Sequence, residues 1–563
     1  MKLKNILYSM MMGTAVLTGT TSCVSDLDQY PHTETTSKDV YTSLANYEAV
    51  LGKIYAAMVT SGQGKGGDNK DMESVLNNGK GFDYMRMFIN MQECGTDEFA
   101  STWLTGEQTT GLTYLSWDAN DAWVSDMYYR IYYNIALCNE FLRNANSASF
   151  SGADAEKMKE YKAEVRFMRA LFYYHALDFY RNIPMVTEND PVGSYIPPRY
   201  TPQQTFDYIE SELKDCVGDM LPASTCPYGQ ASQGAAYTLL AKLYLNSEVY
   251  TGVAKYPECK EACEKVMSMG YSLESDYSKL FNADNDKRTN EIIFALPVSA
   301  EHTVSWGSST YLVCGQVSMS NANQNVADYG VTAGWSEFRL RPEFVDKFTQ
   351  TDIDGGGDKR CKFFTNGQSK DISSMTDEAS GYLSEKWSNL KDDGTTASNT
   401  GDAGVDTDFP LFRLADVYLM YAECVARTQG ASWDPWPEGK TDAADPEVIA
   451  SRKQGAIYWI NLLRERAYGK DENGNPRGQV WSSNFADDDA FLQFILDERA
   501  RELYHEGYRR TDLIRYGQFT TNKYIWQWKG GVHDGQAVDS KYNIYPIPNT
   551  ELTANPNLHN DNY

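Results

Sequence analysis

The stretch of residues 498–515 reads ERARELYHEGYRRTDLIR. It ends a run of helical periodicity that extends from Asp487 to His505. Acidic and basic side chains alternate in it, and Asp497 stands four residues before Arg501, the spacing of an ion pair on one helix face. Two carboxylates about 5 Å apart would serve a retaining glycosidase. Because arginines are interleaved with the acids, we expect a network of ion pairs holding the last long helix and its turn instead of an active site.

Outward from this stretch, helical periodicity recurs along most of the chain. The segment 155–180 is apolar on two faces, which predicts a helix packed on two sides. We predict a mainly α fold of stacked helix pairs, although no strict period of about 34 residues is present. The predicted helices are 39–59, 120–144, 155–180, 202–218, 231–248, 257–269 and 487–505, with two more around 412–426 and 460–467.

The amino-acid composition changes between residues 282 and 407, where Gly, Ser, Asn and Asp dominate. Short apolar runs such as Ile292 to Pro297 suit isolated strands better than helices. We predict an irregular, loop-rich part laid on the helical scaffold. Loops held by a rigid frame are where binding residues usually lie.

The composition restricts the classes of function. The 563-residue chain has a formal charge of −26, which argues against a surface that binds nucleic acid. Its 10 cysteines show no C-x-x-C spacing, so neither a disulfide framework nor a zinc site is implied. Cys259 and Cys263 stand at helical spacing and are read as packing residues.

Motifs for catalysis are missing from the sequence. There is no G-x-S-x-G and no H-E-x-x-H, and the 6 histidines are spread over the chain. Gly229 and Gly234 have the spacing of a phosphate-binding loop, but Ala235 and Ala236 stand where its Lys and hydroxyl would be. We therefore predict a protein that is not an enzyme and needs no cofactor.

The first residues read as a lipoprotein leader. Lys2 and Lys4 precede an apolar run that is too short to span a bilayer, and small residues lead to Cys23. We predict a signal peptide over 1–22, a lipid-bearing Cys23, and an extended tether to residue 38. Bacterial lipoprotein signals usually have Leu three residues before the cysteine, where this chain has Thr20. The alternative is a soluble secreted protein whose first cysteine happens to lie near the cleavage point.

Several segments together resemble the SusD/RagB family, the surface lipoproteins of Bacteroidetes that work with a TonB-dependent transporter in nutrient uptake. The similarity covers most of the chain in order and is weakest over 60–118 and 300–400, where we expect ligand specificity to lie. The segments that carry it are Tyr161–Tyr174 with Asn182-Ile183-Pro184, Ala231–Asn246, Phe412–Glu423, Glu498–Arg515, and the ending Pro546-Ile547-Pro548, Glu551 and Asn555-Pro556-Asn557.

The resemblance implies a right-handed stack of tetratricopeptide-like helix pairs, an outer-membrane position at the cell surface, a palmitate-bearing anchor and a SusC-like partner transporter. It also suggests a division of the chain. The expected parts are the signal peptide 1–22, the anchor and tether 23–38, a helical part 39–281, a variable ligand-binding part 282–407 and a second helical part 408–563.

A glycan site needs a flat ring to stack on the C–H face of a sugar, with polar groups beside it for the hydroxyls. The chain is rich in such rings, with 39 Tyr, 22 Phe and 12 Trp. Aromatic residues that fall in predicted loops beside polar residues are the candidates, although packing is an alternative for any one of them. The predicted ligand-binding residues are Trp103, Trp306, Tyr311, Trp335, Asp97, Asn321 and Asn323.

Asp352, Asp354 and Asp358 alternate around a glycine turn and could hold a hard cation such as Ca²⁺. The stretch lacks the bidentate Glu of an EF-hand, so a solvated turn is the simpler interpretation. The resemblance implies a structural role for Asp358 and Arg360.

The leading hypothesis is a non-catalytic surface lipoprotein that captures oligo- or polysaccharide and passes it to a SusC-like transporter. Capture of oligopeptides, as the resemblance also allows, is one alternative. A helical-repeat scaffold without a small ligand is the other.

Overall fold

The computed structural model describes residues 37–62, 72, 76, 82–399, 401, 404–430, 446–561 and 563. The predicted leader, Cys23 and the first part of the tether lie outside these residues. The chain falls into two compact units, Met1–Tyr47 and Glu48–Tyr563, and the second contains every element from residue 82 onward. Among the described residues, no helix is both long and apolar enough to cross a bilayer.

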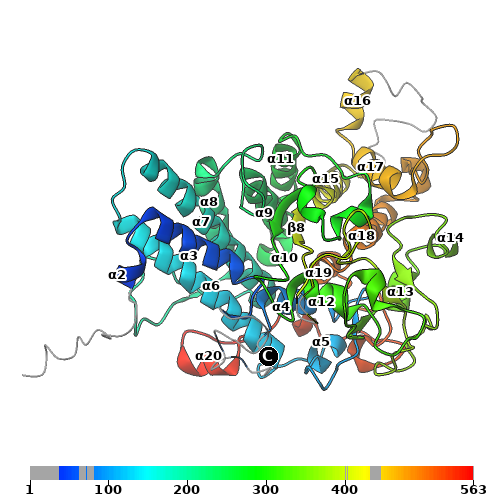
Figure 1. Cartoon of the computed structure of the whole chain (residues 1–563), viewed down its shortest axis with the longest axis horizontal. Coiled ribbons are helices and arrows are strands. Elements are labelled where there is room, and N and C mark those ends of the chain that lie inside the picture. Colours follow the sequence, from blue (N-terminus) through cyan, green and yellow to red (C-terminus); the bar gives the residue numbers. More distant parts are fainter. Residues whose placement is uncertain are drawn as a thin grey trace, which may run out of the picture. The chain divides into compact units, whose positions relative to one another are not determined.

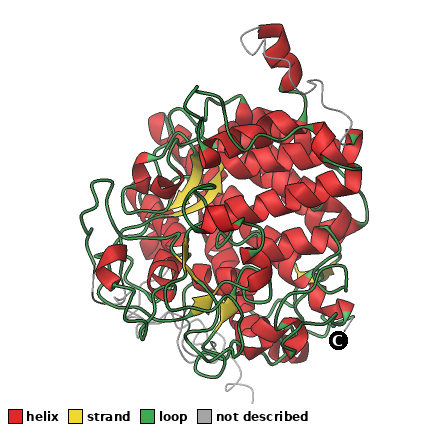
Figure 2. Ribbon diagram, turned by 90° about the vertical axis from the view of Figure 1, so that its right-hand side faces the viewer, coloured by secondary structure: helices red, strands yellow, loops and turns green. Residues whose placement is uncertain are grey.

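Long helices that pack on one another in series form the core of the second unit (Figures 1 and 2). α7 packs against both α6 and α8. α11 packs against both α9 and α15, and α15 also contacts α17 and α18. This is the predicted mainly α fold of stacked helix pairs. The series comprises α6 (Ala122–Ser147), α7 (Ala153–Tyr180), α8 (Pro202–Cys216), α9 (Gln233–Leu245), α11 (Tyr256–Met267), α15 (Leu414–Gln429), α17 (Ala456–Tyr468) and α18 (Asp488–Leu503).

Local sequence signals set the ends of these helices. Thr201 and Gln204 form a reciprocal capping box at the start of α8, with Pro202 in the first turn. The Asp121 carboxylate accepts hydrogen bonds from two backbone N–H groups at the start of α6. In α7, the predicted packing on two sides is confirmed, because nearly every residue after Met158 is buried.

The remaining helices are mostly short. Residues 39–59, predicted as one helix, form two. These other α-helices are α2 (Ser37–Val40), α3 (Leu44–Ala56), α4 (Tyr84–Glu93), α5 (Thr110–Tyr114), α10 (Ser247–Thr251), α12 (Ser308–Gly315), α13 (Pro342–Val345), α14 (Gln350–Ile353), α16 (Pro446–Arg452), α19 (Arg509–Arg515) and α20 (Asn549–Ala554).

Paired antiparallel strands connect the loop-rich part to the helices. The strand predicted over 292–297 is β4 (Ile292–Leu296), and it pairs with β8 (Phe409–Arg413), which leads directly into α15. The other pairs are β1 (Ala100–Ser101) with β5 (Phe338–Arg339), β2 (Ile183–Pro184) with β3 (Arg199–Tyr200), and β6 (Phe363–Phe364) with β7 (Leu383–Ser384).

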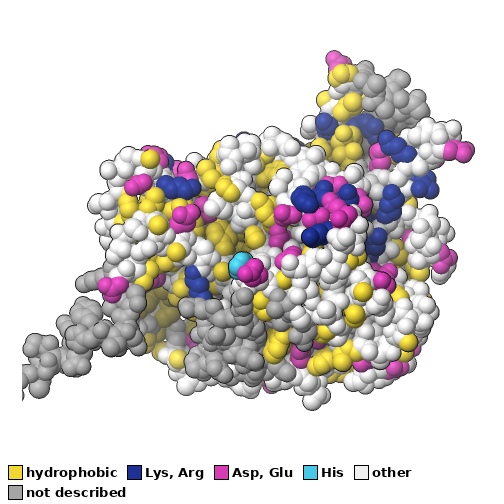
Figure 3. All heavy atoms as spheres, in the orientation of Figure 1, with side chains coloured by type: hydrophobic (Ala, Val, Ile, Leu, Met, Phe, Trp, Pro, Cys, Tyr) yellow, Lys and Arg dark blue, Asp and Glu magenta, His cyan; other side chains and the backbone are white. Residues whose placement is uncertain are grey.

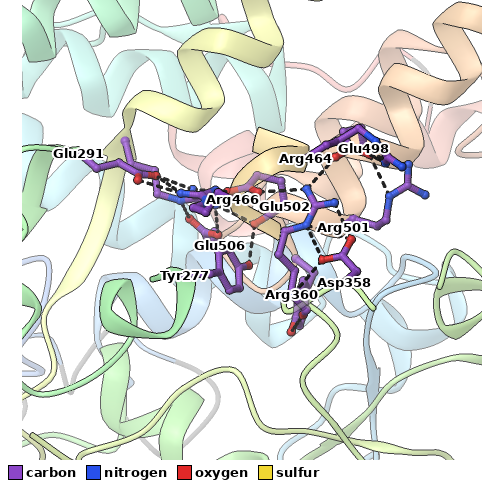
Figure 4. A network of polar contacts seen from close by, with 12 residues as sticks. Tyr277, Glu291, Asp358, Arg360, Arg464, Arg466, Glu498, Arg501, Glu502 and Glu506 are labelled. Atoms are coloured by element: carbon purple, nitrogen blue, oxygen red, sulfur yellow. Dashed lines mark hydrogen bonds and ion pairs between the residues drawn. The ribbon is translucent and has the colours of Figure 1, made fainter. Parts of the chain in front are cut away.

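The ERARELYHEGYRRTDLIR stretch forms a buried network of ion pairs, as predicted (Figure 4). We call it the frame network. Arg360 donates to Glu498 at 2.7 Å and to Glu502 at 3.2 Å, and Arg413 donates to Glu502 at 2.6 Å and to Glu506 at 2.7 Å. The side chains of all five residues are fully buried. Since each carboxylate faces arginine at hydrogen-bond distance, the network pins α18 to the chain around it.

The helical spacing of Asp497 and Arg501, however, suggested the wrong partners for them, because Arg501 pairs with Glu498 at 2.7 Å and Asp497 with Lys347 at 2.8 Å.

Charged side chains on the surface are mixed in sign. On the face shown in Figure 3, Lys and Arg lie among Asp and Glu, with scattered hydrophobic side chains between them. This face therefore presents no continuous basic surface to a polyanion.

Candidate functional site

Three of the predicted ligand-binding tryptophans come together at the surface of the loop-rich part. Trp103 follows β1, Trp306 precedes α12, and Trp335 precedes β5. The side chain of Trp103 is 38% exposed, and the other two are half-buried. We call these three residues the tryptophan rim.

Backbone pairing places Trp103 beside Trp335. In the β1–β5 pair, Ala100 lies opposite Arg339 and Ser101 opposite Phe338. The indole N–H of Trp103 then donates to the backbone carbonyl of Trp335 at 3.0 Å. This hydrogen bond fixes the orientation of the exposed ring before any ligand arrives.

Arg86 in the first turn of α4 connects the other two tryptophans. Its guanidinium lies 3.8 Å from the ring centroid of Phe82, 4.2 Å from that of Tyr311 and 5.8 Å from that of Trp335. One of its N–H groups donates to the backbone carbonyl of Trp306 at 2.7 Å. A buried cation stacked on rings in this way holds loops that are far apart in the sequence.

Two buried carboxylates balance the charge of Arg86. Glu107 forms an ion pair with it, and Glu337 lies 3.5 Å away. Burial alone would lower the pKa of Arg86, but the two carboxylates outweigh it, so the pKa lies above its usual value. Burial raises the pKa of Glu337 well above the usual range, and Arg86 only partly offsets this.

Asp83 attaches the Trp306 loop to the start of α4. Its carboxylate accepts from the backbone N–H of Arg86 at 2.8 Å as the N-cap, and from the hydroxyl of Ser305 at 2.6 Å. A Cβ at Gly307 would lie 2.1 Å from the Asp83 carboxylate, so only glycine allows this approach.

Backbone strain accompanies the tryptophan rim. Three residues other than glycine with positive φ lie in the same loops as the tryptophans: Gln108 at 60°, Ser308 at 47° and Ser336 at 50°. Such conformations cost about 1–3 kcal/mol each and gather at binding sites, where the surrounding structure holds them in place.

The structure corrects the prediction for Tyr311 and Asp97. Tyr311 in α12 is fully buried and donates to the side chain of Asn90 at 2.6 Å, so its ring packs against Arg86 inside the protein and does not face solvent. Asp97 is also fully buried, 2.6 Å from Arg509. Burial opposes ionisation of Asp97, but Arg509 and Lys347 outweigh it and lower its pKa. Both residues were predicted from sequence position alone, which does not distinguish a ring or carboxylate at the surface from one beneath it.

Asn321 and Asn323 lie in the next loop. Asn321 donates to the carbonyl of Asn366 at 2.8 Å and is half-buried, whereas Asn323 is exposed. The backbone N–H of Met319, which is 64% exposed, donates to the hydroxyl of Ser336 at 2.6 Å. This contact joins the asparagine loop to the residue after Trp335.

The aspartates considered for a cation serve the local turn. Asp352 forms a capping box with Thr349 and accepts from the backbone N–H of Asp358 at 2.6 Å. Asp358 pairs with Arg360 at 2.6 Å, in line with the structural role that the resemblance implied for both, and Asp354 accepts from Gln350 at 2.9 Å. In the described part of the chain, no group of three acidic, histidine or cysteine residues is arranged to hold a metal ion.

Asp83, Arg86, Glu107 and Glu337 were not among the site residues predicted from the sequence. They belong to α4 and to loop segments without periodicity, in or near the stretches where the family resemblance is weakest. Arg86, Asn90 and Glu93 lie at helical spacing in α4, but every residue of this helix is buried. Its polar side therefore faces the interior, whereas a polar helix face in a sequence normally indicates solvent.

Comparisons with known proteins agree with this fold. The family model described as "SusD family" matches residues 357–563, and the model described as "Starch-binding associating with outer membrane" matches residues 27–245. The curated starch-binding protein SusD of Bacteroides thetaiotaomicron is 32% identical to this chain, over 99% of both chains. The SusD-like protein P25 of Formosa agariphila is 25% identical over 78% of both chains.

Solved structures show the same architecture at low sequence identity. A SusD-like protein from Bacteroides fragilis superposes with a TM-score of 0.67 at 18% identity, covering 95% of this chain and all of that one. The surface glycan-binding protein A from Bacteroides fluxus has a TM-score of 0.64 at 19% identity, covering 91% of this chain and 97% of that one. With an identity of 32% over nearly the whole length of a curated member, the chain belongs to the SusD family.

Proposed function

We propose that this protein binds glycans on the tryptophan rim. The observation that carries the proposal is the set of contacts that joins the three tryptophans. Arg86 holds the Trp306 carbonyl and lies near the Trp335 ring, and the exposed Trp103 ring donates its indole N–H to the Trp335 carbonyl. An exposed, fixed indole offers a flat apolar face to the C–H groups of a sugar ring. Asn323 in the neighbouring loop is exposed and can bond to sugar hydroxyls.

The names of the relatives support a glycan as the ligand class. One is a starch-binding protein and another a surface glycan-binding protein, and these are names of binding proteins, not of enzymes. Because the starch-binding relative is 32% identical over nearly the whole chain, α-glucans are the first ligands to test.

The division of labour along the chain is part of the same proposal. The helical parts 39–281 and 408–563 form the scaffold, and the variable part 282–407 supplies Trp306, Trp335, Asn321 and Asn323 to the ligand. Trp103 is the contribution of the first helical part, since the β1–β5 pairing joins its loop to the variable part.

The cellular setting is proposed from the sequence and the relatives. After removal of residues 1–22, Cys23 carries acyl chains that hold the protein at the outer surface of the outer membrane. There it passes its ligand to a SusC-like TonB-dependent transporter. The family model whose description includes association with the outer membrane supports this location.

Affinity electrophoresis in gels containing soluble starch, followed by calorimetry with maltoheptaose, tests the ligand. We expect wild type and the control Trp481→Ala to be retarded, and Trp103→Ala and Trp335→Ala to run freely. Trp481 is a half-buried tryptophan near α17, so it controls for the loss of an indole elsewhere.

Other outcomes separate the alternatives. Failure on a full glycan panel together with binding of oligopeptides would favour a peptide-capturing protein. Binding of a partner protein that survives all three tryptophan replacements, without any small ligand, would favour a scaffold.

A further inference from the structure

A second aromatic surface lies away from the tryptophan rim, where α6, the segment 184–197 and α20 meet. It is a groove of about 260 Å³, and we call it the tyrosine groove. Figure 1 shows α20 beneath α6, and the hydroxyls of Tyr129 and Thr550 join the two helices at 2.5 Å. The groove shares no residue with the tryptophan rim.

Tyrosine rings form one wall of the groove. The ring centroids of Tyr128 and Tyr132 are 4.5 Å apart, and Tyr129 meets Tyr128 edge to face at 5.9 Å. Tyr129 and Tyr132 are half-buried, as is Tyr195 in the segment opposite. The Tyr128 ring is tilted by 35° to that of Tyr132 and stands at 85° to that of Tyr129, so the wall presents ring faces as well as ring edges.

The phenolic hydroxyls at the groove already have partners in the protein. The hydroxyl of Tyr132 donates to the carbonyl of Pro184 at 2.8 Å, and that of Tyr129 is bonded to Thr550. The groove therefore offers ring faces more than free hydroxyls. This suits a cation with an apolar stem better than it suits a sugar, which requires hydrogen bonds around its edge.

Of the described residues that line the groove, Glu551 alone is charged at neutral pH. No Lys, Arg or His of the described residues pairs with it, but it hydrogen-bonds with the Tyr129 side chain, and its charge raises the pKa of Tyr128 and Tyr129 beyond the effect of burial. The nearest basic residue along β3, Arg199, is already paired with Asp561. The groove thus carries an uncompensated negative charge beside π faces.

Two aliphatic side chains of the segment that carries Tyr195 are exposed, and one of them, Ile196, lines the groove. Val192 is 77% exposed and Ile196 is 50% exposed. Neighbouring exposed aliphatic side chains of this kind fit the flanks of an extended polypeptide and not an isolated ion.

We propose that the tyrosine groove receives an arginine or lysine side chain from an extended segment of a partner protein. The cationic head group lies against the faces of Tyr129, Tyr132 and Tyr195 and pairs with Glu551, while the residues on either side contact Val192 and Ile196. Charge complementarity selects the occupant, because a cation satisfies both the carboxylate and the rings. This binding is independent of glycan capture at the tryptophan rim.

The probe is the peptide acetyl-Leu-Pro-Arg-Pro-Leu-amide, compared with the same peptide carrying citrulline in place of arginine. Citrulline keeps the shape and removes the charge. Binding to the full mature chain is followed by saturation-transfer NMR titration. We expect the citrulline peptide to bind about tenfold more weakly.

The variants Glu551→Gln and Tyr195→Ser test the two halves of the site. We expect each variant to bind the arginine peptide with about five- to tenfold lower affinity than wild type. Glu301→Gln, at a side chain that is 74% exposed, and Trp103→Ala should bind the peptide as wild type does. Thermal unfolding midpoints equal to that of wild type show that the variants fold.

Equal binding of the arginine and citrulline peptides, or no measurable binding of either to wild type, would overturn the proposal. A loss of maltoheptaose affinity in Tyr195→Ser with no effect on the peptide would also overturn it, since the groove would then be a second sugar subsite.

Discussion

The frame network and the tryptophan rim are built from the same groups. In each, an arginine pairs with at least two carboxylates and lies against aromatic rings: Arg413 with Glu502, Glu506, Tyr277 and Phe281, and Arg86 with Glu107, Glu337, Phe82 and Tyr311. These four partners of Arg413 are all buried. Around Arg86 the inner partners are enclosed as well, but the carbonyls and rings beyond it belong to tryptophans at the surface.

The difference shows that the same contacts of arginine with carboxylates and rings can stabilise the core in one region and position surface loops in another. The partners of Arg413 lie on or beside β8 and α18, so the network mainly fixes the packing of regular elements. Of the partners of Arg86, Tyr311 lies in α12, whereas Phe82 and the two carboxylates lie in irregular segments. The same contacts therefore mainly fix the positions of loops whose tryptophan side chains face solvent. Stability should depend on the frame network and ligand binding on the rim, and the predictions below test that division.

The largest expected effect is on stability. Arg413→Ala leaves Glu502 and Glu506 buried with one partner fewer, and we expect the free energy of unfolding to fall by about 3–5 kcal/mol. Urea unfolding followed by circular dichroism measures it. A loss below about 1 kcal/mol would mean that the remaining arginines compensate and that the network is redundant.

Arg86→Met should affect both properties, because Arg86 is buried and also holds the tryptophan loops. We expect a loss of about 2–4 kcal/mol in unfolding free energy from the unpaired carboxylates. Glycan affinity should fall about tenfold or more at a temperature where the variant is fully folded. Unchanged affinity in the folded variant would show that Trp306 and Trp335 hold their positions without this cation.

Trp103→Ala should separate the two properties most cleanly. The exposed ring contributes little to packing, so the free energy of unfolding should stay within about 0.5 kcal/mol of wild type. Maltoheptaose affinity should fall by about 2 kcal/mol, roughly thirtyfold. Calorimetry and urea unfolding on the same preparation give both values, and a stability loss larger than the binding loss would contradict the division.

The two regions should also respond to pH in opposite senses. Burial opposes ionisation of Glu502, but Arg466, Arg413 and Arg360 lower its pKa to about 2. Its stabilising contribution is therefore present above the unfolded value of 4.5 and is lost as pH falls from there toward 2. The folded-state pKa of Glu337 is raised by burial, so its contribution is complete below 4.5 and declines as pH rises.

Two variants check this sign. Glu502→Gln should be destabilised relative to wild type at pH 7, with a difference that shrinks as pH falls below 4.5. The free energy of unfolding of Glu337→Gln should increase relative to that of wild type as pH rises above 4.5. Urea unfolding at pH 2.5, 3, 4, 5, 6, 7 and 8 measures both, and parallel curves for the two variants would refute the contrast.

The smallest expected effect is at the surface. Lys214 and Glu210 form an ion pair on α8 in which the lysine is 57% exposed. Lys214→Ala should change the free energy of unfolding by no more than about 0.5 kcal/mol. It serves as the matched control for Arg413→Ala, and a change above 1 kcal/mol would mean that charge removal in general destabilises this acidic chain.

The two regions also differ in how well the sequence predicted them. The acids of the frame network could be foreseen because Glu498, Glu502 and Glu506 recur at helical spacing. Their partners Arg360 and Arg413, however, come from other segments. The long helices could be foreseen from their apolar faces.

Within the rim, the tryptophans could be named from their loop positions, but Arg86, which contacts Trp306 and Trp335, could not. It lies in a helix buried on every side, and its partners come from residues 82, 107, 311 and 337.

The errors in the site have the same physical origin. Tyr311 and Asp97 stand near polar residues in the sequence, as surface residues do, yet α12 and the α4–β1 connection carry them inside. Long-range pairing, here between β1 and β5, decides which side of a loop faces solvent, and a sequence pattern does not report it.

The hydrogen bond from the Trp103 indole to the Trp335 carbonyl has a kinetic consequence. Because the ring is already oriented, encounter with a sugar chain needs no slow closure of a loop, so the association rate should lie near the usual range for unhindered binding, about 10⁵–10⁷ M⁻¹s⁻¹. Differences in affinity among sugars would then appear almost entirely as differences in residence time. A protein of this kind would bind its ligands quickly and discriminate among them by their dissociation rates.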